Sequence, residues 1–162
     1  MLYLFKRLTG FALCCFLLAA CQTTPAKHGL TPQQIATLKS EGFVETDAGW
    51  AFSMNDKLLF DLNDSRLKEG QRESIHRLAR VLLGVQINAA RVEGHTDTTG
   101  TKAFNDMLSQ KRAESVAEAM IEAGMPRQNL RIEGLGSRYP ILPNTTEENR
   151  RENRRVVIII SN

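Results

Sequence analysis

Apolar residues recur at intervals of three and four in two long stretches of the chain. This spacing builds one apolar face on a helix, and it predicts amphipathic helices near residues 66–84 and 101–123. The inward positions expected of the first helix are Ile75, Leu78, Ala79, Leu82 and Leu83, and those of the second are Phe104, Leu108, Val116, Met120 and Ala123. Gly84 and Gly124 are placed to end the two helices.

Shorter apolar runs predict strands near 57–61, 90–95, 131–135 and 155–161. The last run, RVVIIIS, is so rich in β-branched residues that a central position in the sheet is expected for it. Along the chain the order is strand, helix, strand, helix, strand, loop, strand. This order predicts an α+β sandwich, with helices packed on one face of a mixed four-stranded sheet.

The segment 31–54, which precedes these elements, is apolar where a linker would be polar. Thr31 and Pro32 are typical of a helix start, and Gly42 is placed to end that helix. Large apolar side chains of this kind are enriched at protein interfaces, and four are candidates for contact with a partner protein: Leu38, Phe43, Trp50 and Phe52. The alternative is that they pack back onto the domain, wholly or in part.

The first twenty residues have the layout of a secretory signal. Lys6 and Arg7 precede an apolar run from Phe11 to Ala20, about half of the ~20 residues that a helix needs to cross a bilayer. The sequence LAAC, which ends at Cys21, resembles the lipobox of bacterial lipoproteins. The resemblance implies cleavage before Cys21 and attachment of lipid to its thiol. It also implies sorting to the outer membrane, because Gln22, the residue after the cysteine, is not the aspartate that marks retention in the inner membrane.

Export would leave Cys21 as the single cysteine, because Cys14 and Cys15 belong to the signal. Two or more acyl chains on it would anchor the protein to a membrane without further contacts. Residues 22–30 are polar and without apolar periodicity, which indicates a tether. Removing 20 of the 162 residues leaves 142, enough for one domain, and lowers the formal charge from +3 to +1. A nucleic-acid role therefore has no electrostatic basis.

An acid and an arginine are the strongest candidates for binding chemistry. Asp97 lies just past a strand end, beside the start of the second helix, and Gly100 permits the turn between them. Arg112 falls near the apolar stripe of that helix, where a guanidinium needs a carboxylate or a polar cleft. Brought to one cleft, the pair would bind a zwitterion. The alternatives are a plain salt bridge between the two side chains, or an arginine that extends to water.

Three motifs resemble the signature of OmpA-like peptidoglycan-binding domains: TDTTG at 96–100, LSQKRAESV at 108–116 and NRRV at 153–156. The resemblance covers roughly residues 55 to 161. It implies a ligand in the cell wall, namely the diaminopimelate of the stem peptide, whose free end carries an ammonium and a carboxylate.

Carried over residue by residue, the resemblance assigns ligand binding to Asp97 and Arg112. Asp61 resembles a further binding-loop acid of some members, and Thr101 and Asn105 are expected to line the same cleft.

The sequence gives less support to an enzymatic function or a metal site. His95 and Asp97 stand two apart and could suggest a metal pair, but zinc needs three or four ligands, and His28 and His76 belong to the tether and a helix surface. The chain has no GxSxG elbow. The arginine-rich run 150–155 could bind an anion, but a solvated edge, with arginines held by acids and backbone, is the favoured interpretation. We therefore expect a binding protein with no cofactor and no metal.

The lipobox, the segment 31–54 and the GHTD-containing domain together resemble OmpA-like lipoproteins of a three-part signalling system. The resemblance implies capture of a periplasmic repressor protein, which frees an inner-membrane diguanylate cyclase to make cyclic di-GMP. A lipoprotein that only anchors the outer membrane to the wall is the alternative, and a homodimer is left open. The expected organisation is a signal peptide (1–20), lipidated cysteine and tether (21–30), partner-docking segment (31–54) and OmpA-like domain (55–162).

Overall fold

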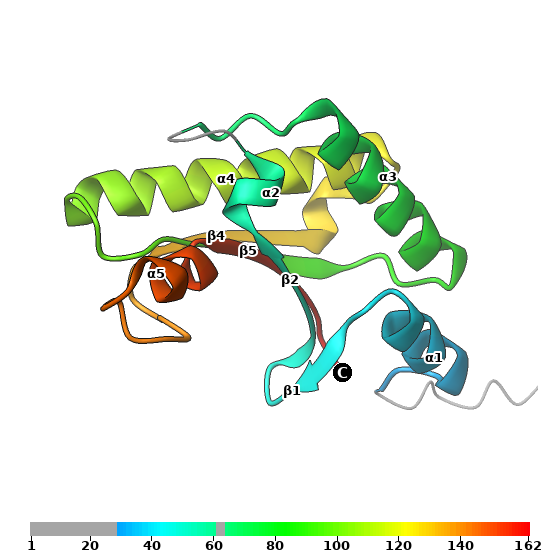
Figure 1. Ribbon diagram of the computed structural model, residues 1–162. Coiled ribbons are helices and arrows are strands. Elements are labelled where there is room, and N and C mark those ends of the chain that lie inside the picture. Colours follow the sequence, from blue (N-terminus) through cyan, green and yellow to red (C-terminus); the bar gives the residue numbers. More distant parts are fainter. Residues whose placement is uncertain (1–28, 61–63) are drawn as a thin grey trace, which may run out of the picture.

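A five-stranded mixed sheet organises the chain (Figure 1). The structure, a computed structural model, describes residues 29–60 and 64–162. The strands are β1 (Val44–Thr46), β2 (Gly49–Asn55), β3 (Ala90–His95), β4 (Leu130–Gly136) and β5 (Arg155–Ile160), in the spatial order β1-β2-β5-β3-β4. The pair β3–β4 is parallel and the other pairs are antiparallel. The predicted α+β class is confirmed, with five strands in place of four.

The β-branched strand β5 lies at the centre of the sheet, as its composition predicts. It pairs with β2 from Trp50–Ile160 to Asn55–Arg155, and with β3 on its other side. All of its residues are buried. Residues of the segment 31–54 thus form two strands of the same sheet, and the segment is an integral part of the domain.

Two long helices, α3 (Glu69–Gly84) and α4 (Lys102–Glu122), cover one face of the sheet (Figure 1). Three shorter ones are α1 (Pro32–Ser40), α2 (Asp56–Leu59) and α5 (Glu147–Asn153), and a 3₁₀ turn spans Arg127–Asn129. Within the described ranges no helix has the length and apolar character to cross a bilayer. Both long helices match their predicted ranges closely. The left-handed residue after α3, however, is Gln86 (φ 63°) rather than Gly84.

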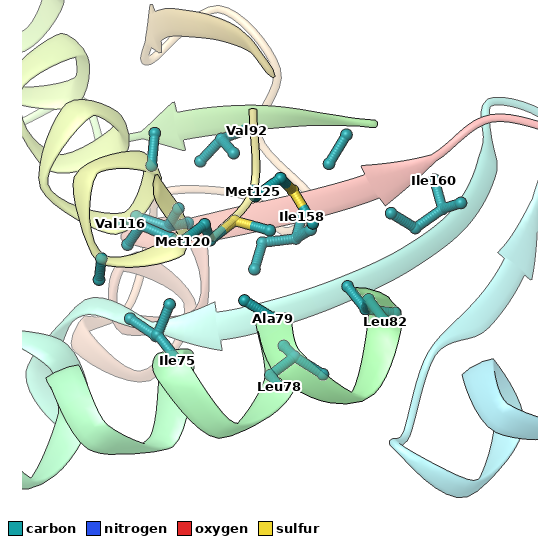
Figure 2. Close-up of a cluster of buried hydrophobic side chains, with 14 of the residues drawn as sticks. Ile75, Leu78, Ala79, Leu82, Val92, Val116, Met120, Met125, Ile158 and Ile160 are labelled. Atoms are coloured by element: carbon teal, nitrogen blue, oxygen red, sulfur yellow. The ribbon is translucent and has the colours of Figure 1, made fainter. Parts of the chain in front are cut away.

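The core lies between these helices and the sheet (Figure 2). The predicted apolar face of α3 contributes Ile75, Leu78, Ala79 and Leu82, and Val92 and Ile158 approach from the sheet. Val116 and Met120 of α4 are fully buried. The prediction that Phe104 points inward is wrong, because its side chain is 41% exposed at the first turn of α4.

The strand predicted near 57–61 is also wrong, because α2 occupies Asp56–Leu59. Asn55 ends β2, and its side-chain oxygen accepts a hydrogen bond from the backbone N–H of Lys57 (3.0 Å), which is a helix N-cap. Leu58 is consequently exposed while Leu59 points into the core. A short apolar run is ambiguous between strand and helix, and the cap decides in favour of the helix.

Glycines on the sheet bring α4 into direct contact with two strands. Gly94 of β3 and Gly134 of β4 both face the helix, and a Cβ at Gly134 would lie 2.5 Å from the backbone nitrogen of Gln110. The backbone N–H of Gly134 also donates to Oε1 of Gln110 (2.6 Å). The middle of α4 is therefore fixed against the sheet, and with it the position of Arg112, which follows Gln110 by two residues.

Candidate binding site

A cavity of about 530 Å³ lies where α2, the first half of α4 and the start of α5 meet. Its polar and charged lining includes Asp56, Asp97, Asn105, Arg112, Glu147 and Arg154. The structure thus brings Asp97, Asn105 and Arg112, three of the predicted site residues, to one cavity.

The loop after β3 presents Asp97. The backbone N–H of Thr99 donates to Oδ1 of Asp97 (2.7 Å), and the side-chain amide of Asn105 donates to the backbone oxygens of Asp97 (3.2 Å) and Thr99 (3.0 Å). Gly100 adopts the left-handed conformation (φ 89°) that the turn requires. Asn105 thus holds the loop that presents the carboxylate, and it is buried while doing so.

Thr101 does not line this cavity. It is the N-cap of α4, and its hydroxyl accepts a hydrogen bond from the backbone N–H of Phe104 (3.2 Å). As the N-cap, Thr101 stabilises the start of the helix that carries Asn105 and Arg112. Phe104, three residues later, lines the cavity.

Arg112 is buried, with 3% of its surface exposed. Its Nη1 donates to Oδ2 of Asp56 (2.9 Å) and its Nε donates to the backbone oxygen of Asp64 (3.2 Å). The guanidinium also lies 5.1 Å from the ring centroid of Phe60, within cation–π range. Burial lowers the pKa of Arg112 from its usual value, against the raising effect of Asp56. As the pattern on the helix predicts, this arginine has a carboxylate partner.

That partner is not Asp97, so the direct salt bridge considered above does not form. Asp97 pairs with Arg154, whose Nη1 donates to Oδ2 of Asp97 (2.6 Å). Arg154 also reaches Glu147 through Nη2 (2.8 Å), and its Nε lies 3.6 Å from Oδ2 of Asp56. Burial raises the pKa of Asp56, while Arg112 and Arg154 act in the opposite direction. The charges alternate in the order Arg112, Asp56, Arg154, Asp97.

Arginines of the run 150–155 bind acids and backbone oxygens, as the favoured interpretation of this run predicts. Arg154 is bound to acids, and Arg155 donates to the backbone oxygens of Asn153 (3.1 Å) and Tyr139 (3.2 Å). The sequence did not indicate that Arg154 lines the same cavity as Asp97 and Arg112. The NRRV motif was the available signal for this residue, whereas Asp56 belongs to none of the quoted motifs.

Two predicted positions, Asp61 and Cys21, lie outside the described residues. His95 does not share the cavity of Asp97, because it is buried elsewhere with Nε2 3.4 Å from Oε2 of Glu93. Within residues 29–60 and 64–162 no three His, Cys, Asp or Glu side chains are placed to hold a metal ion.

Three of the four candidate partner contacts, Leu38, Phe43 and Trp50, are buried in the core. In this conformation they pack onto the domain, the alternative given above. Phe52 differs. It lies on β2 and lines a second cavity of about 590 Å³ between β2 and α3. Two exposed apolar residues stand beside it in the lining, Leu58 (64% exposed) and Ile141 (56% exposed). We call this surface the β2–α3 groove.

Comparison with known proteins places this chain in a family. Residues 59–154 match the OmpA family, and the chain belongs to that family. It is an OmpA-family lipoprotein of the outer membrane. The chain is 48% identical over 143 residues to the outer-membrane lipoprotein YfiB of Pseudomonas aeruginosa, a match that covers 88% of this chain and 85% of that protein. It is 40% identical over 146 residues to the putative lipoprotein YfiB of Escherichia coli K12, with 90% of each covered.

Solved structures agree with the assignment. The peptidoglycan-associated lipoprotein of Burkholderia pseudomallei superposes with a TM-score of 0.57 at 25% identity, over 66% of this chain and 83% of that one. The periplasmic domain of Helicobacter pylori MotB (residues 90–256) gives a TM-score of 0.65 at 28% identity, over 74% and 77%.

Proposed function

We propose that the cavity binds peptidoglycan through the free end of diaminopimelate, with the ammonium at Asp97 and the carboxylate at Arg112. The observation that carries this proposal is that a buried arginine and a buried aspartate, which are not paired with each other, line one cavity. Membership of the OmpA family and the likeness to a peptidoglycan-associated lipoprotein support it.

The contacts already made by the two side chains leave atoms for such a ligand. Arg112 uses Nε and Nη1 within the protein, and Nη2 has no hydrogen bond to any residue of the described ranges. Asp97 accepts one hydrogen bond on each oxygen, and a carboxylate has about four lone-pair sites. An ammonium and a carboxylate on one carbon therefore find complementary groups without breaking the fold.

Retention of the full chain in detergent on purified peptidoglycan tests this function. Arg112→Lys keeps the charge but removes the planar guanidinium, and with it the Nη2 donor that is left for the ligand. We expect its retention to fall by about 10-fold or more, as for loss of a hydrogen bond to a charged group. Arg127→Lys is the matched control, because Arg127 is an exposed residue paired with Glu118 far from the cavity. Equal retention of both variants would refute the assignment of Arg112.

We further propose that the protein captures a YfiR-like periplasmic repressor and so relieves inhibition of a YfiN-like inner-membrane diguanylate cyclase, which raises cyclic di-GMP. The 48% identity to a YfiB lipoprotein over most of both chains supports this proposal. Of the predicted contact residues, Phe52 is accessible through the β2–α3 groove. Leu38, Phe43 and Trp50 would reach a repressor only after the segment leaves the core.

The groove offers a partner an apolar surface bordered by charge. The rings of Phe52 and Phe43 lie 5.3 Å apart, so the accessible ring rests on a buried one. On the same cavity, Arg77 and Glu41 form an ion pair of 2.9 Å. An apolar centre with a charged rim is typical of protein interfaces, and a wall anchor alone has no need of it.

Capture of a purified YfiR-like repressor by the full chain separates the two functions. We expect Leu58→Glu and Ile141→Glu to abolish capture while retention on peptidoglycan is unchanged, because both residues are exposed and lie in the groove. Val44→Glu is the control, since Val44 is equally exposed but lies on the edge strand β1 outside the groove. Normal capture by the two groove variants would show that the groove is not the docking surface, whereas no capture by the unaltered chain would leave the wall anchor as the better account.

A further inference from the structure

Asp56 contacts both arginines of the ligand cavity. Its Oδ2 lies 2.9 Å from Nη1 of Arg112 and 3.6 Å from Nε of Arg154. Its backbone N–H donates to the carbonyl oxygen of Arg154 (2.9 Å). This carboxylate is buried, it opens α2 directly after β2, and it belongs to none of the motifs that point to the wall ligand.

The orientation of Arg112 depends on two anchors. Nε is bound to the carbonyl oxygen of Asp64, and Nη1 is bound to Asp56. Because a guanidinium is planar, two fixed atoms fix the direction of the third nitrogen, Nη2. With the carboxylate of Asp56 removed, one anchor would remain and the plane could turn about it.

The same carboxylate influences the opposite wall of the cavity. Arg154 stands between Asp56 and Asp97, and it holds Oδ2 of Asp97 at 2.6 Å from Nη1. Loss of the charge on Asp56 would leave Arg154 attracted by Asp97 and by Glu147, an exposed acid. The acid that is proposed to receive the ligand's ammonium would then be covered more tightly.

A purely structural account of this carboxylate is weaker. A buried ion pair adds little net stability, because burial of the two charges offsets much of their attraction. Burial here opposes the charged form of both members, raising the pKa of Asp56 and lowering that of Arg112. A buried charge kept at the wall of a ligand cavity is better explained by the geometry that it imposes on its neighbours.

We propose that Asp56 is a positioning residue, which fixes the guanidinium of Arg112 relative to the carboxylate of Asp97 and thereby selects ligands that carry both an ammonium and a carboxylate. The inference rests on the proposed wall-binding function and names the residue that sets its selectivity. In this proposal Asp56 acts through Arg112 and Arg154, the two arginines that it contacts.

Calorimetric titration of the full chain in detergent with two soluble muropeptides tests this inference. One muropeptide carries diaminopimelate with its free end intact, and the other has the carboxylate of that end amidated. For Asp56→Asn we expect affinity for the free form to fall on the order of 10-fold and the ratio of the two affinities to approach one. Glu118→Gln is the control for loss of one carboxylate charge, because Glu118 is exposed and pairs with Arg127 outside the cavity, and it should keep the wild-type ratio.

The outcomes separate the two proposals. If the unaltered chain binds neither muropeptide, the wall-binding function itself is wrong. If it discriminates between them and folded Asp56→Asn keeps the same ratio, Asp56 is structural and the inference is overturned. Should circular dichroism show that Asp56→Asn does not fold, Asp56→Glu replaces it. That variant keeps the charge on a stem one methylene longer, so a reduced ratio supports positioning and a wild-type ratio overturns it.

Discussion

Gly94 of β3 approaches Ser109 of α4 so closely that a Cβ on the glycine would lie 2.0 Å from the carbonyl oxygen of the serine. Both atoms belong to regular elements, so neither side can move alone. The contact fixes the helix that carries Arg112 against the strand that leads to Asp97.

Substitution of Gly94 by alanine should therefore destabilise the whole domain. Overpacking of this kind costs about 1–3 kcal/mol, and here the clash is with backbone, which cannot adopt another rotamer. Urea denaturation measures the loss. Gly70→Ala on α3 is the control, because no heavy atom lies within 4 Å of a Cβ there, and a stability equal to or above that of the unaltered chain is expected for it. A harmless Gly94→Ala would contradict the described contact.

Trp50 should behave as a core residue. Its side chain is buried in the same cluster as Leu38 and Phe43, and truncation of a buried tryptophan to alanine costs about 3–5 kcal/mol. We expect Trp50→Ala to lower the melting temperature strongly and Leu58→Ala to leave it nearly unchanged. Equal melting temperatures would show that Trp50 is exposed for a large part of the time. Loss of repressor capture by Trp50→Ala is informative only once its folding has been checked.

His95 should make the fold sensitive to mild acid. Burial is the largest cause that lowers the pKa of His95 below its usual 6.5, against the raising effect of Glu93. Between the folded pKa and 6.5 the unfolded chain binds the proton more readily, so stability falls as the pH falls through this window. Thermal unfolding followed from pH 7.5 downward measures the slope. We expect His95→Asn to flatten it, and an unchanged slope would place the acid sensitivity on another group.

Asn153 should stabilise the connection between β4 and β5. Its buried side chain accepts hydrogen bonds from the backbone N–H groups of Ile141 (2.8 Å) and Leu142 (3.1 Å), and donates to the oxygen of Leu142 (2.8 Å). Asn153→Ala would leave these groups unpaired, at a cost of about 1–3 kcal/mol for each one that stays buried. Hydrogen exchange should show faster exchange at Ile141 and Leu142, and protection as in the unaltered chain would contradict the role.

The parts of the fold that the sequence predicts well are those with a strong local period. The strand 90–95 and the helix near 101–123 were placed correctly because each pattern repeats over its whole length. The strand near 57–61 failed because Leu58, Leu59 and Phe60 carry no period, and a side-chain cap on Asn55 decides the conformation.

The site was predicted only as far as its motifs reach. Asp97 and Arg112 lie in quoted motifs, Asn105 stands between these two motifs, and all three residues share a cavity. Asp56 is 56 positions from Arg112 in sequence, and no spacing rule links two residues so far apart. Likewise, a pattern of apolar residues predicts that Trp50 is buried. It does not say whether a partner protein or the chain's own core covers the side chain.

The central strand β5 follows every other described strand in chain order, yet β2 and β3 both pair with it and not with each other. Without β5, the first four strands form two separate pairs, β1–β2 and β3–β4, that do not touch as neighbours in the sheet. Only β5 joins these two pairs into one sheet, and the side chain of Arg154, the residue just before it, completes the cavity beside Asp97. A chain cut short before β5 would therefore lack both the continuous sheet and the arginine that contacts Asp97.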